Sequence, residues 1–248
     1  MKKNNYSSSA EFWRKNKPRV MGDIIGRPRV IDLLGDIRGK KILESGAGAG
    51  YLARALAQKG ALVFGCEREK KMLEVAVDFE KKEPLGIKYD LADITKTPYE
   101  SNFFDGVSSV SVLIHNDTKA IELFFREAHR ILKKGGILVV SVSHPFLFTL
   151  FSPTRMKNKC WLKHESLEDK PYNESQKFKE FYYDIEGNVF MSEVWHHTIS
   201  TYIGVALETK LKITKIQELI IEKNHLLTPL WGKEYGYPAF FQIKAMKS

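Results

Sequence analysis

Apolar stretches of strand length alternate with helical patterns along residues 41–143, and this alternation constrains the fold more than any other feature of the chain. ALVFGC (61–66) and ILVVSVS (137–143) are two of the strand candidates, and residues 118–132 show the helical spacing. Such alternation is typical of a parallel sheet covered by helices on both faces. The sequence therefore predicts an α/β protein with a doubly wound sheet.

The carboxyl ends of the predicted strands meet at one edge of the sheet, where open α/β sheets bind their ligands. Polar residues and glycines that are far apart in the chain are thereby brought together. The positions at this edge are Glu44 with the loop 46–50, Glu67, Asp93, residues 110–115 and His144.

A glycine loop, GAGAG (46–50), lies between the first predicted strand and the helix that follows it. Gly46 and Gly48 allow a sharp turn and expose backbone N–H groups at a helix N-terminus. The dinucleotide pattern G-x-G-x-x-G would need its third glycine where this chain has Tyr51. The loop therefore departs from the pattern of a pyrophosphate site.

Two carboxylates flank this loop and indicate the charge of its ligand. Glu44 would repel a pyrophosphate but attract a ligand with an ammonium and a sulfonium group, and S-adenosylmethionine has both. Glu67 lies 17 positions after Gly50 and can accept hydrogen bonds from both hydroxyls of a ribose. An NAD enzyme could use Glu67 equally well, so Glu44 and Tyr51 are the discriminating residues. The alternative is that Glu44 is a solvated acid at a strand end and that the glycines only form the turn.

Four segments together resemble the class I S-adenosylmethionine-dependent methyltransferases: ILESGAGAG (42–50), GCERE (65–69), LADITKTPYESNFFDGVSSVSVLIHND (91–117) and EAHRILKKGGILVVS (127–141). The resemblance is to the small-molecule branch that includes the ubiquinone-type C-methyltransferases. It covers residues 31–143 well and residues 200–247 loosely. It implies a Rossmann-like sheet that is mostly parallel, with an antiparallel last strand at 239–246.

The resemblance also implies the cofactor and the role of each matching position. S-adenosylmethionine is the implied cofactor, with Glu44, Gly46, Ala47, Gly48 and Gly50 facing its methionine moiety. Glu67 is implied for the ribose hydroxyls, Arg68 beside the adenine, Asp93 for the adenine amino group, Ile94 for a ring nitrogen and backbone near Val110 for the ammonium. Ser45 is a departure, because many relatives have an apolar residue there.

Two histidines are candidates for removing a proton from the methyl acceptor, since histidine suits general base catalysis near pH 7. His144 is the favoured candidate because it follows the fifth strand and Pro145 holds the next turn. His115, in LIHND, is the second candidate, although family members often carry histidine there for structural or cofactor contacts. For both, the alternative is an ordinary hydrogen-bonded loop histidine. The sequence does not place His196 and His197.

The chain is expected to form one domain over residues 1–248, with an N-terminal arm at 1–28 and a substrate cap inserted at 145–198. The arm is expected to contain a short helix around residues 12 and 13. The cap is rich in aromatic residues, which either form its own small core or line a pocket for an apolar or planar acceptor.

Composition limits the partners. The net charge is +9, and residues 1–41 hold 11 basic residues against 4 acidic ones. This excess is either a solvated surface or an attraction for an anionic substrate or nucleic acid. Nucleic acid is disfavoured because no NPPY-type motif follows the fourth strand.

No apolar run reaches the roughly 18 residues of a membrane helix, and no secretory signal is expected. Cys66 and Cys160 form no metal-type pair. We therefore expect a cytoplasmic protein without membrane or metal, in an oligomeric state that the sequence leaves open.

The sequence thus predicts an enzyme that moves a methyl group from S-adenosylmethionine to O, N or C of a small organic acceptor. An RNA or DNA methyltransferase is one alternative. A non-catalytic S-adenosylmethionine-binding protein is the other, because this chemistry needs no invariant catalytic residue.

Overall fold

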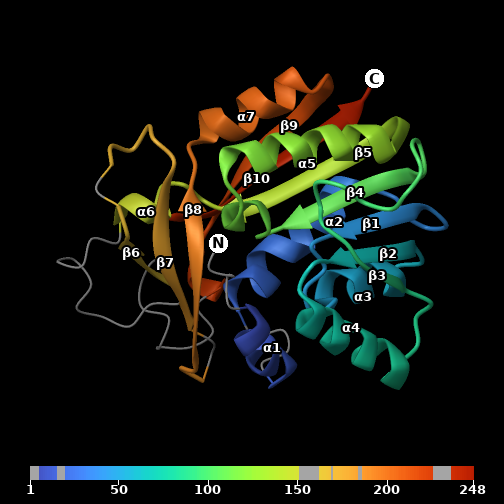
Figure 1. Cartoon of the computed structure of the whole chain (residues 1–248), viewed down its shortest axis with the longest axis horizontal. Coiled ribbons are helices and arrows are strands. Elements are labelled where there is room, and N and C mark those ends of the chain that lie inside the picture. Colours follow the sequence, from blue (N-terminus) through green and yellow to red (C-terminus); the bar gives the residue numbers. More distant parts are fainter. Residues whose placement is uncertain (1–5, 16–19, 151–161, 169, 184–185, 226–235) are drawn as a thin grey trace.

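A seven-stranded sheet forms the centre of the computed structural model, which describes residues 6–15, 20–150, 162–168, 170–183, 186–225 and 236–248 (Figure 1). The strand order is β3-β2-β1-β4-β5-β10-β9. β1 to β5 run parallel, whereas β10 is antiparallel to both β5 and β9. The predicted doubly wound, Rossmann-like sheet with an antiparallel last strand is therefore confirmed. The strands are β1 (Lys41–Ser45), β2 (Leu62–Glu67), β3 (Lys88–Leu91), β4 (Phe104–Val110), β5 (Leu132–Ser143), β9 (Leu211–Ile220) and β10 (Pro238–Lys247).

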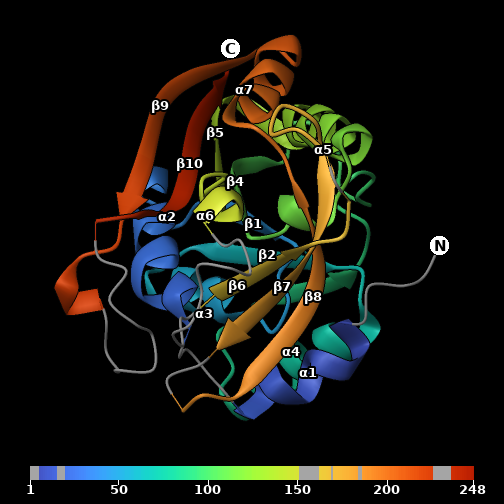
Figure 2. The ribbon, with the colours of Figure 1, turned by 90° about the vertical axis from the view of Figure 1, so that its left-hand side faces the viewer.

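Helices cover both faces of the sheet (Figures 1 and 2). Apolar residues of α2 and α3 share one core cluster with β1 and β2, and those of α5 and α7 share another with β4, β5 and β10. The helices are α1 (Tyr6–Lys15), α2 (Arg27–Leu34), α3 (Tyr51–Gln58), α4 (Lys70–Lys82), α5 (Thr118–Ile131), α6 (Leu147–Leu150) and α7 (Ile199–Glu208), with 3-10 turns η2 (Leu113–His115) and η3 (Lys223–His225).

The α5 helix shows how local sequence sets an element. The Asp117 side chain accepts a hydrogen bond from the Ala120 N–H at 2.9 Å, which satisfies one of the free N–H groups of the first turn. Phe124 and Phe125 are buried against the sheet. β5 begins directly after the helix, at Leu132, earlier than the predicted residue 137. The β4–β5 pairing shifts register between Phe104 and Gly106 to accommodate the additional residues.

The expected arm contains two helical segments. α1 covers the short helix expected around residues 12 and 13, and a π-helical turn, η1 (Gly22–Gly26), runs directly into α2. The Gln242 amide of β10 donates to the Gly26 carbonyl at 3.1 Å and to the Ser141 hydroxyl at 3.0 Å. These bonds fix the turn to the sheet beside the ends of β5 and β10.

A separate three-stranded antiparallel sheet follows β5, which confirms the predicted cap insertion. Its strands are β6 (Leu162–Ser166), β7 (Gln176–Tyr183) and β8 (Val189–His196). Residues 151–161 of the predicted cap lie outside the described residues. Figures 1 and 2 show this sheet beyond one end of the central strands, with α1 between it and α4.

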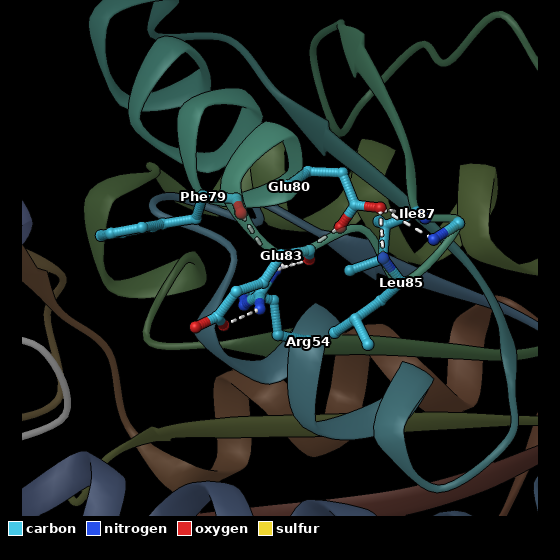
Figure 3. Close-up of polar contacts among 7 residues, drawn as sticks. Arg54, Phe79, Glu80, Glu83, Leu85 and Ile87 are labelled. Carbon is cyan, nitrogen blue, oxygen red and sulfur yellow. Dashed lines mark hydrogen bonds and ion pairs between the residues drawn. The ribbon is translucent and has the colours of Figure 1, made fainter.

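A polar network ties α3, the helix after the glycine loop, to α4 (Figure 3). The buried Arg54 donates to the Glu83 carboxylate at 2.7 Å and to the Glu83 carbonyl at 3.0 Å. The Glu80 carboxylate accepts three backbone hydrogen bonds from residues 85–87 at 2.7 to 3.2 Å. Burial of an Arg is tolerated when its charge is paired in this way. The network therefore holds α3 in place behind the loop.

Candidate cofactor-binding and active site

One cavity opens at the carboxyl ends of β1, β2 and β4 and encloses about 1160 Å³, its open mouth included. Most of the residues predicted from the sequence line it: Glu44, Gly46, Ala47, Gly48, Glu67, Arg68, Ile94, Val110 and His115. Gly50, Asp93 and His144 are not among the residues that form its wall. The fold therefore brings together residues that are up to 71 positions apart, as the topology of a parallel sheet requires.

The glycine loop is shaped by steric limits on both sides. Gly46 has a φ of +77°, and a Cβ atom there would lie 2.8 Å from a methyl carbon of Val112. Gly50 has a φ of +79°, and a Cβ atom there would collide with the hydroxyl of Tyr89. Both positions therefore require glycine, Gly46 in the cavity wall and Gly50 beneath it.

Glu44 is buried, with 4% of its surface exposed, and its carboxylate accepts a hydrogen bond from the Ala53 N–H at 2.8 Å. It thereby satisfies an N–H in the first turn of α3, whose N-cap residue Gly50 has no side chain. Burial raises the pKa of Glu44 to about 8, against the opposing effect of Arg27. The interpretation of Glu44 as a solvated acid is therefore wrong, and a cationic ligand would favour its ionised form.

Glu67 lies on the opposite side of the glycine loop from Glu44. Its two carboxylate oxygens accept hydrogen bonds from the Gly48 N–H and the Glu69 N–H, each at 2.9 Å. Burial raises the pKa of Glu67, and these backbone donors oppose the rise. A carboxylate oxygen has a second lone pair, so Glu67 can still accept bonds from a ribose diol.

The N-terminal segment contributes to the site in a way that the sequence did not indicate. Trp13 and Arg27 line the cavity. Arg27 forms an ion pair with Asp23, and its guanidinium carbon lies 5.8 Å from the ring centroid of Tyr51. The indole N–H of Trp13 is buried, and no described residue accepts a hydrogen bond from it. The i, i+4 spacing of Asp23 and Arg27 was the available sequence signal, but it did not indicate which way the pair faces.

Another contribution that the sequence did not indicate is Ser111, immediately after β4. Ser111 has a φ of +56°, which is strained for a residue other than glycine, and it lines the cavity. Its N–H donates to the Ser141 carbonyl of β5 at 2.8 Å. The Asn116 side chain, also in the wall, donates to the Val112 carbonyl at 2.8 Å. The chain thus turns sharply here and presents residues 110–116 to the cavity.

His115 lies in this turn, and its ring contacts the cap. Its Nδ1 lies 3.2 Å from the Glu193 carbonyl of β8. Because a carbonyl only accepts hydrogen bonds, Nδ1 carries a proton and the basic lone pair of neutral His115 lies on Nε2. Burial lowers the pKa of His115 below its usual value of 6.5. The ring is therefore neutral near pH 7, as a proton acceptor must be.

His144 has a different environment. It is buried, its Nδ1 accepts a hydrogen bond from the Phe146 N–H at 3.1 Å, and its Nε2 lies 2.7 Å from the Glu218 carboxylate. Both ring nitrogens therefore have partners within the turn and β9. The proposal that His144 is the base stays untested, but His115 lines the cavity and His144 is not among the residues of its wall, which favours His115.

Asp93 holds its own turn. Its carboxylate accepts hydrogen bonds from the Thr95 N–H at 2.8 Å and the Thr95 hydroxyl at 2.7 Å. Its neighbour Ile94 is buried and lines the cavity. Recognition of adenine by Asp93 therefore stays a prediction.

Within the described ranges, no cluster of three or more His, Cys, Asp or Glu side chains has an arrangement that could hold a metal ion. None of the described helices combines the length and the apolar character needed to cross a membrane.

Comparison with known proteins agrees with this geometry. Residues 43–140 match a family model described as a methyltransferase domain. Methyltransferase GfsG of Streptomyces halstedii is 36% identical over 106 residues, which are 42% of this chain and 37% of that protein. The ubiquinone biosynthesis O-methyltransferase of Pelagibacter ubique (strain HTCC1062) is 33% identical over 102 residues, 41% of each chain. The chain thus spans about two fifths of the length of these curated relatives.

The similarity in fold is wider. The crystal structure of an S-adenosylmethionine dependent methyltransferase from Mesorhizobium loti has a TM-score of 0.65 and 22% sequence identity, over 88% of this chain and 96% of that one. The fold agrees with the predicted resemblance to the class I methyltransferases. Residues 43–140 match the methyltransferase-domain family model, in agreement with the predicted S-adenosylmethionine-dependent methyltransferase and its cofactor.

Proposed function

We propose that the chain transfers the methyl group of S-adenosylmethionine to an O, N or C atom of a small organic acceptor. The observation that carries this proposal is that one cavity is lined by the glycine loop, by both carboxylates and by His115. A cofactor bound along the loop and an acceptor beside His115 would therefore share one enclosed space. Residues 1–248 are proposed to act as a single domain.

The residues in the wall fit this cofactor. Glu67 suits the ribose hydroxyls, and Glu44 suits the neighbourhood of the ammonium and sulfonium charges. Arg27 and the indole N–H of Trp13 suit the carboxylate at the methionine end. When bound, S-adenosylmethionine supplies an activated methyl group and its leaving group.

His115 is the proposed proton acceptor. Its tautomer, held by the Glu193 carbonyl, leaves Nε2 basic, and its lowered pKa keeps the ring neutral at pH 7. Such a base is needed for an acceptor with a neutral OH, NH or acidic CH group, and not for one that is already ionised.

A small acceptor is supported by the apolar part of the cavity wall and by the name of one relative. Trp13, Val20, Val112 and Phe240 line the cavity and make part of its wall apolar. One of the relatives is a ubiquinone biosynthesis O-methyltransferase. We therefore infer an aromatic or otherwise largely apolar acceptor with one ionisable group.

The basic N-terminal segment gives little support to the nucleic-acid alternative. Arg14 pairs with Asp78 of α4 at 2.9 Å, and Arg27 faces the cavity with Asp23 as its ion-pair partner. These two charges therefore belong to the fold and the cavity, not to a surface for a polyanion. The cytoplasmic location stays a prediction.

The test is methyl transfer from S-adenosylmethionine labelled at its methyl group to a panel of phenols, quinols, amines, carboxylic acids and transfer RNA. Formation of S-adenosylhomocysteine and a labelled product, both detected by mass spectrometry, would support the proposal if a phenol, quinol or amine is modified. Transfer to RNA alone would overturn the small-molecule acceptor. Tight binding without transfer to any acceptor would favour the non-catalytic alternative.

A further inference from the structure

The inner face of the cap sheet contains a carboxylate where apolar residues would be expected. Along β7, Gln176, Phe178 and Glu180 alternate inward, and Phe178 belongs to the main core cluster. Glu180 has 0% of its surface exposed. A carboxylate is almost never fully buried unless another group compensates its charge. Glu180 is therefore placed where its carboxylate would act strongly on protonatable groups around it.

The strand register places Glu180 beside the residue that holds His115. Glu180 pairs with Ser192 of β8, and the next residue of β8 is Glu193, whose carbonyl bonds to His115 Nδ1. Ser192 is 4% exposed, and its buried hydroxyl has no partner among the described residues. Two buried polar side chains of the cap thus lie next to the cap's contact with His115.

Two charged side chains act on the His115 ring from different elements. The negative charge of Glu180, from β7, is the largest influence that raises the pKa of His115 against the effect of burial. Arg68, from the loop after β2, acts in the opposite direction. A third titratable group, His196 of β8, lies on the same inner face of the cap, with its ring centroid 6.3 Å from that of Phe178.

We propose that Glu180 is a positioning residue that stabilises the protonated form of His115 during methyl transfer. This rests on the proposed role of His115 as proton acceptor. The acceptor's X–H bond breaks as its proton moves to Nε2, and its electron pair forms the bond to the methyl carbon. The bond from that carbon to sulfur breaks and leaves its electrons on sulfur, which becomes a neutral thioether. His115 becomes an imidazolium, which the Glu180 carboxylate stabilises, and later releases the proton to water.

This arrangement selects the substrate class. A carboxylate that favours an imidazolium helps only when a proton must be removed, so the structure assigns acceptors with a neutral hydroxyl, N–H or acidic C–H group. An acceptor that is already ionised, such as a carboxylic acid at pH 7, would gain nothing from the pair and would be repelled by Glu180. The base is complete only when the cap is folded over the sheet, because Glu180 and the Glu193 carbonyl both belong to the cap.

The direct test is the pKa of His115 in the full chain, measured by NMR titration of its ring and assigned by comparison with His115→Gln. Glu180→Gln preserves the shape of the side chain and removes its charge, so we expect the pKa of His115 to fall by about one unit. Glu180→Asp keeps the charge and should restore most of that pKa. Glu174→Gln, which removes an exposed charge from the same cap, is the matched control and should leave the pKa unchanged.

Binding of S-adenosylhomocysteine should change less than about twofold in these variants, because Glu180 is not among the residues that line the cofactor cavity. With an acceptor found in the panel, Glu180→Gln should lower kcat about tenfold with little change in KM, and its acid limb should move to lower pH. An unchanged pKa of His115 in a Glu180→Gln variant that still binds S-adenosylhomocysteine would overturn the pairing. A shifted pKa without transfer to any acceptor would support the pairing and count against the proposed function instead.

Discussion

The cofactor side and the cap side of the cavity are built in different ways. On the cofactor side, the loop, Glu44 and Glu67 lie within 24 consecutive residues, and Glu67 bonds to the loop through backbone N–H groups. On the cap side, the His115 contact with Glu193 joins residues 78 positions apart. A site made from a turn and its flanking strands is therefore visible in sequence order, whereas a site made between separate sheets is not.

The cap is joined to the sheet at a second point close to His115. His197 is buried, and its Nε2 donates to the Asn116 carbonyl at 2.8 Å, while its Nδ1 accepts from the Ser175 hydroxyl at 2.9 Å. Glu193 and His197, toward the open end of the β7–β8 hairpin, thus both contact the loop that carries His115. The cap therefore holds the proposed proton acceptor, and the glycine loop lines the proposed cofactor site.

The largest effect is expected on the cofactor side, from Gly46→Ala. The new Cβ would occupy a left-handed backbone and meet Val112, which costs about 1–3 kcal/mol for each of the two effects. We expect S-adenosylhomocysteine affinity to fall at least about 100-fold, as measured by calorimetry, with a lower melting temperature. Gly86→Ala is the control, because Gly86 has the same φ of +77° and nothing within 4 Å of the added Cβ. Equal losses in both variants would show that backbone strain alone is responsible.

The second-largest effect is expected on the cap side, from His115→Gln, and it shows which of the two histidines acts as the base. His115→Gln should lower kcat by about 10²–10⁴-fold, the usual range for loss of general base catalysis, with little change in cofactor affinity. The acid limb of kcat in the wild type should lie below pH 6.5, because burial lowers the pKa of His115 and only the neutral ring accepts a proton.

His144→Gln is the matched control for this experiment. It should retain kcat close to that of the wild type, because its ring bonds to Phe146 and Glu218 and is not among the residues that line the cavity. A large loss in His144→Gln together with a nearly normal His115→Gln would return the role of base to His144.

A moderate effect is expected from Glu67→Ala, which should weaken cofactor binding by about 1–3 kcal/mol. The variant loses the proposed hydrogen-bond acceptor for the ribose. It also loses the carboxylate that accepts hydrogen bonds from the Gly48 and Glu69 N–H groups. Calorimetry with S-adenosylhomocysteine measures this change. Glu74→Ala, at an exposed position of α4, should leave the dissociation constant unchanged. An unaltered constant in a folded Glu67→Ala variant would refute ribose binding by this residue.

The smallest effect is a pH dependence of S-adenosylmethionine affinity. The free protein holds a proton on Glu44 below its pKa of about 8, and the cationic ligand favours the ionised carboxylate, so binding releases a proton. Affinity should therefore rise about fivefold from pH 7 to pH 8 and level off above about pH 9. The raised pKa of Glu67 acts in the same direction.

Calorimetry in buffers of different ionisation enthalpy measures the released proton directly. Glu44→Gln should bind more weakly but lose this release and show a flat profile between pH 7 and 9. Proton release of the same size in that variant would assign the titration to another group.

Features that depend on residues close together in the sequence could be predicted, whereas features that depend on contacts between distant residues could not. The parallel sheet, its antiparallel last strand, the cap after β5 and most of the residues that line the cavity could be predicted. They depend on the period of apolar residues, on glycine conformation and on a local family pattern. The π-helical turn at Gly22–Gly26 could not be predicted, because such a turn has no distinct period and this one is fixed by a side chain from β10, Gln242.

The sequence by itself determined the α/β fold class, the resemblance to a methyltransferase family and the edge of the sheet at which the candidate cofactor residues lie, because the alternation of strands and helices and the local motifs suffice for these. Only the tertiary structure decided which histidine faces the cavity. His115 and His144 both follow strands that end at the same edge, and a ring is turned toward or away from a cavity by the partners it meets. Those partners, the Glu193 carbonyl for His115 and the Glu218 carboxylate for His144, come from distant strands that no local pattern could pair in advance.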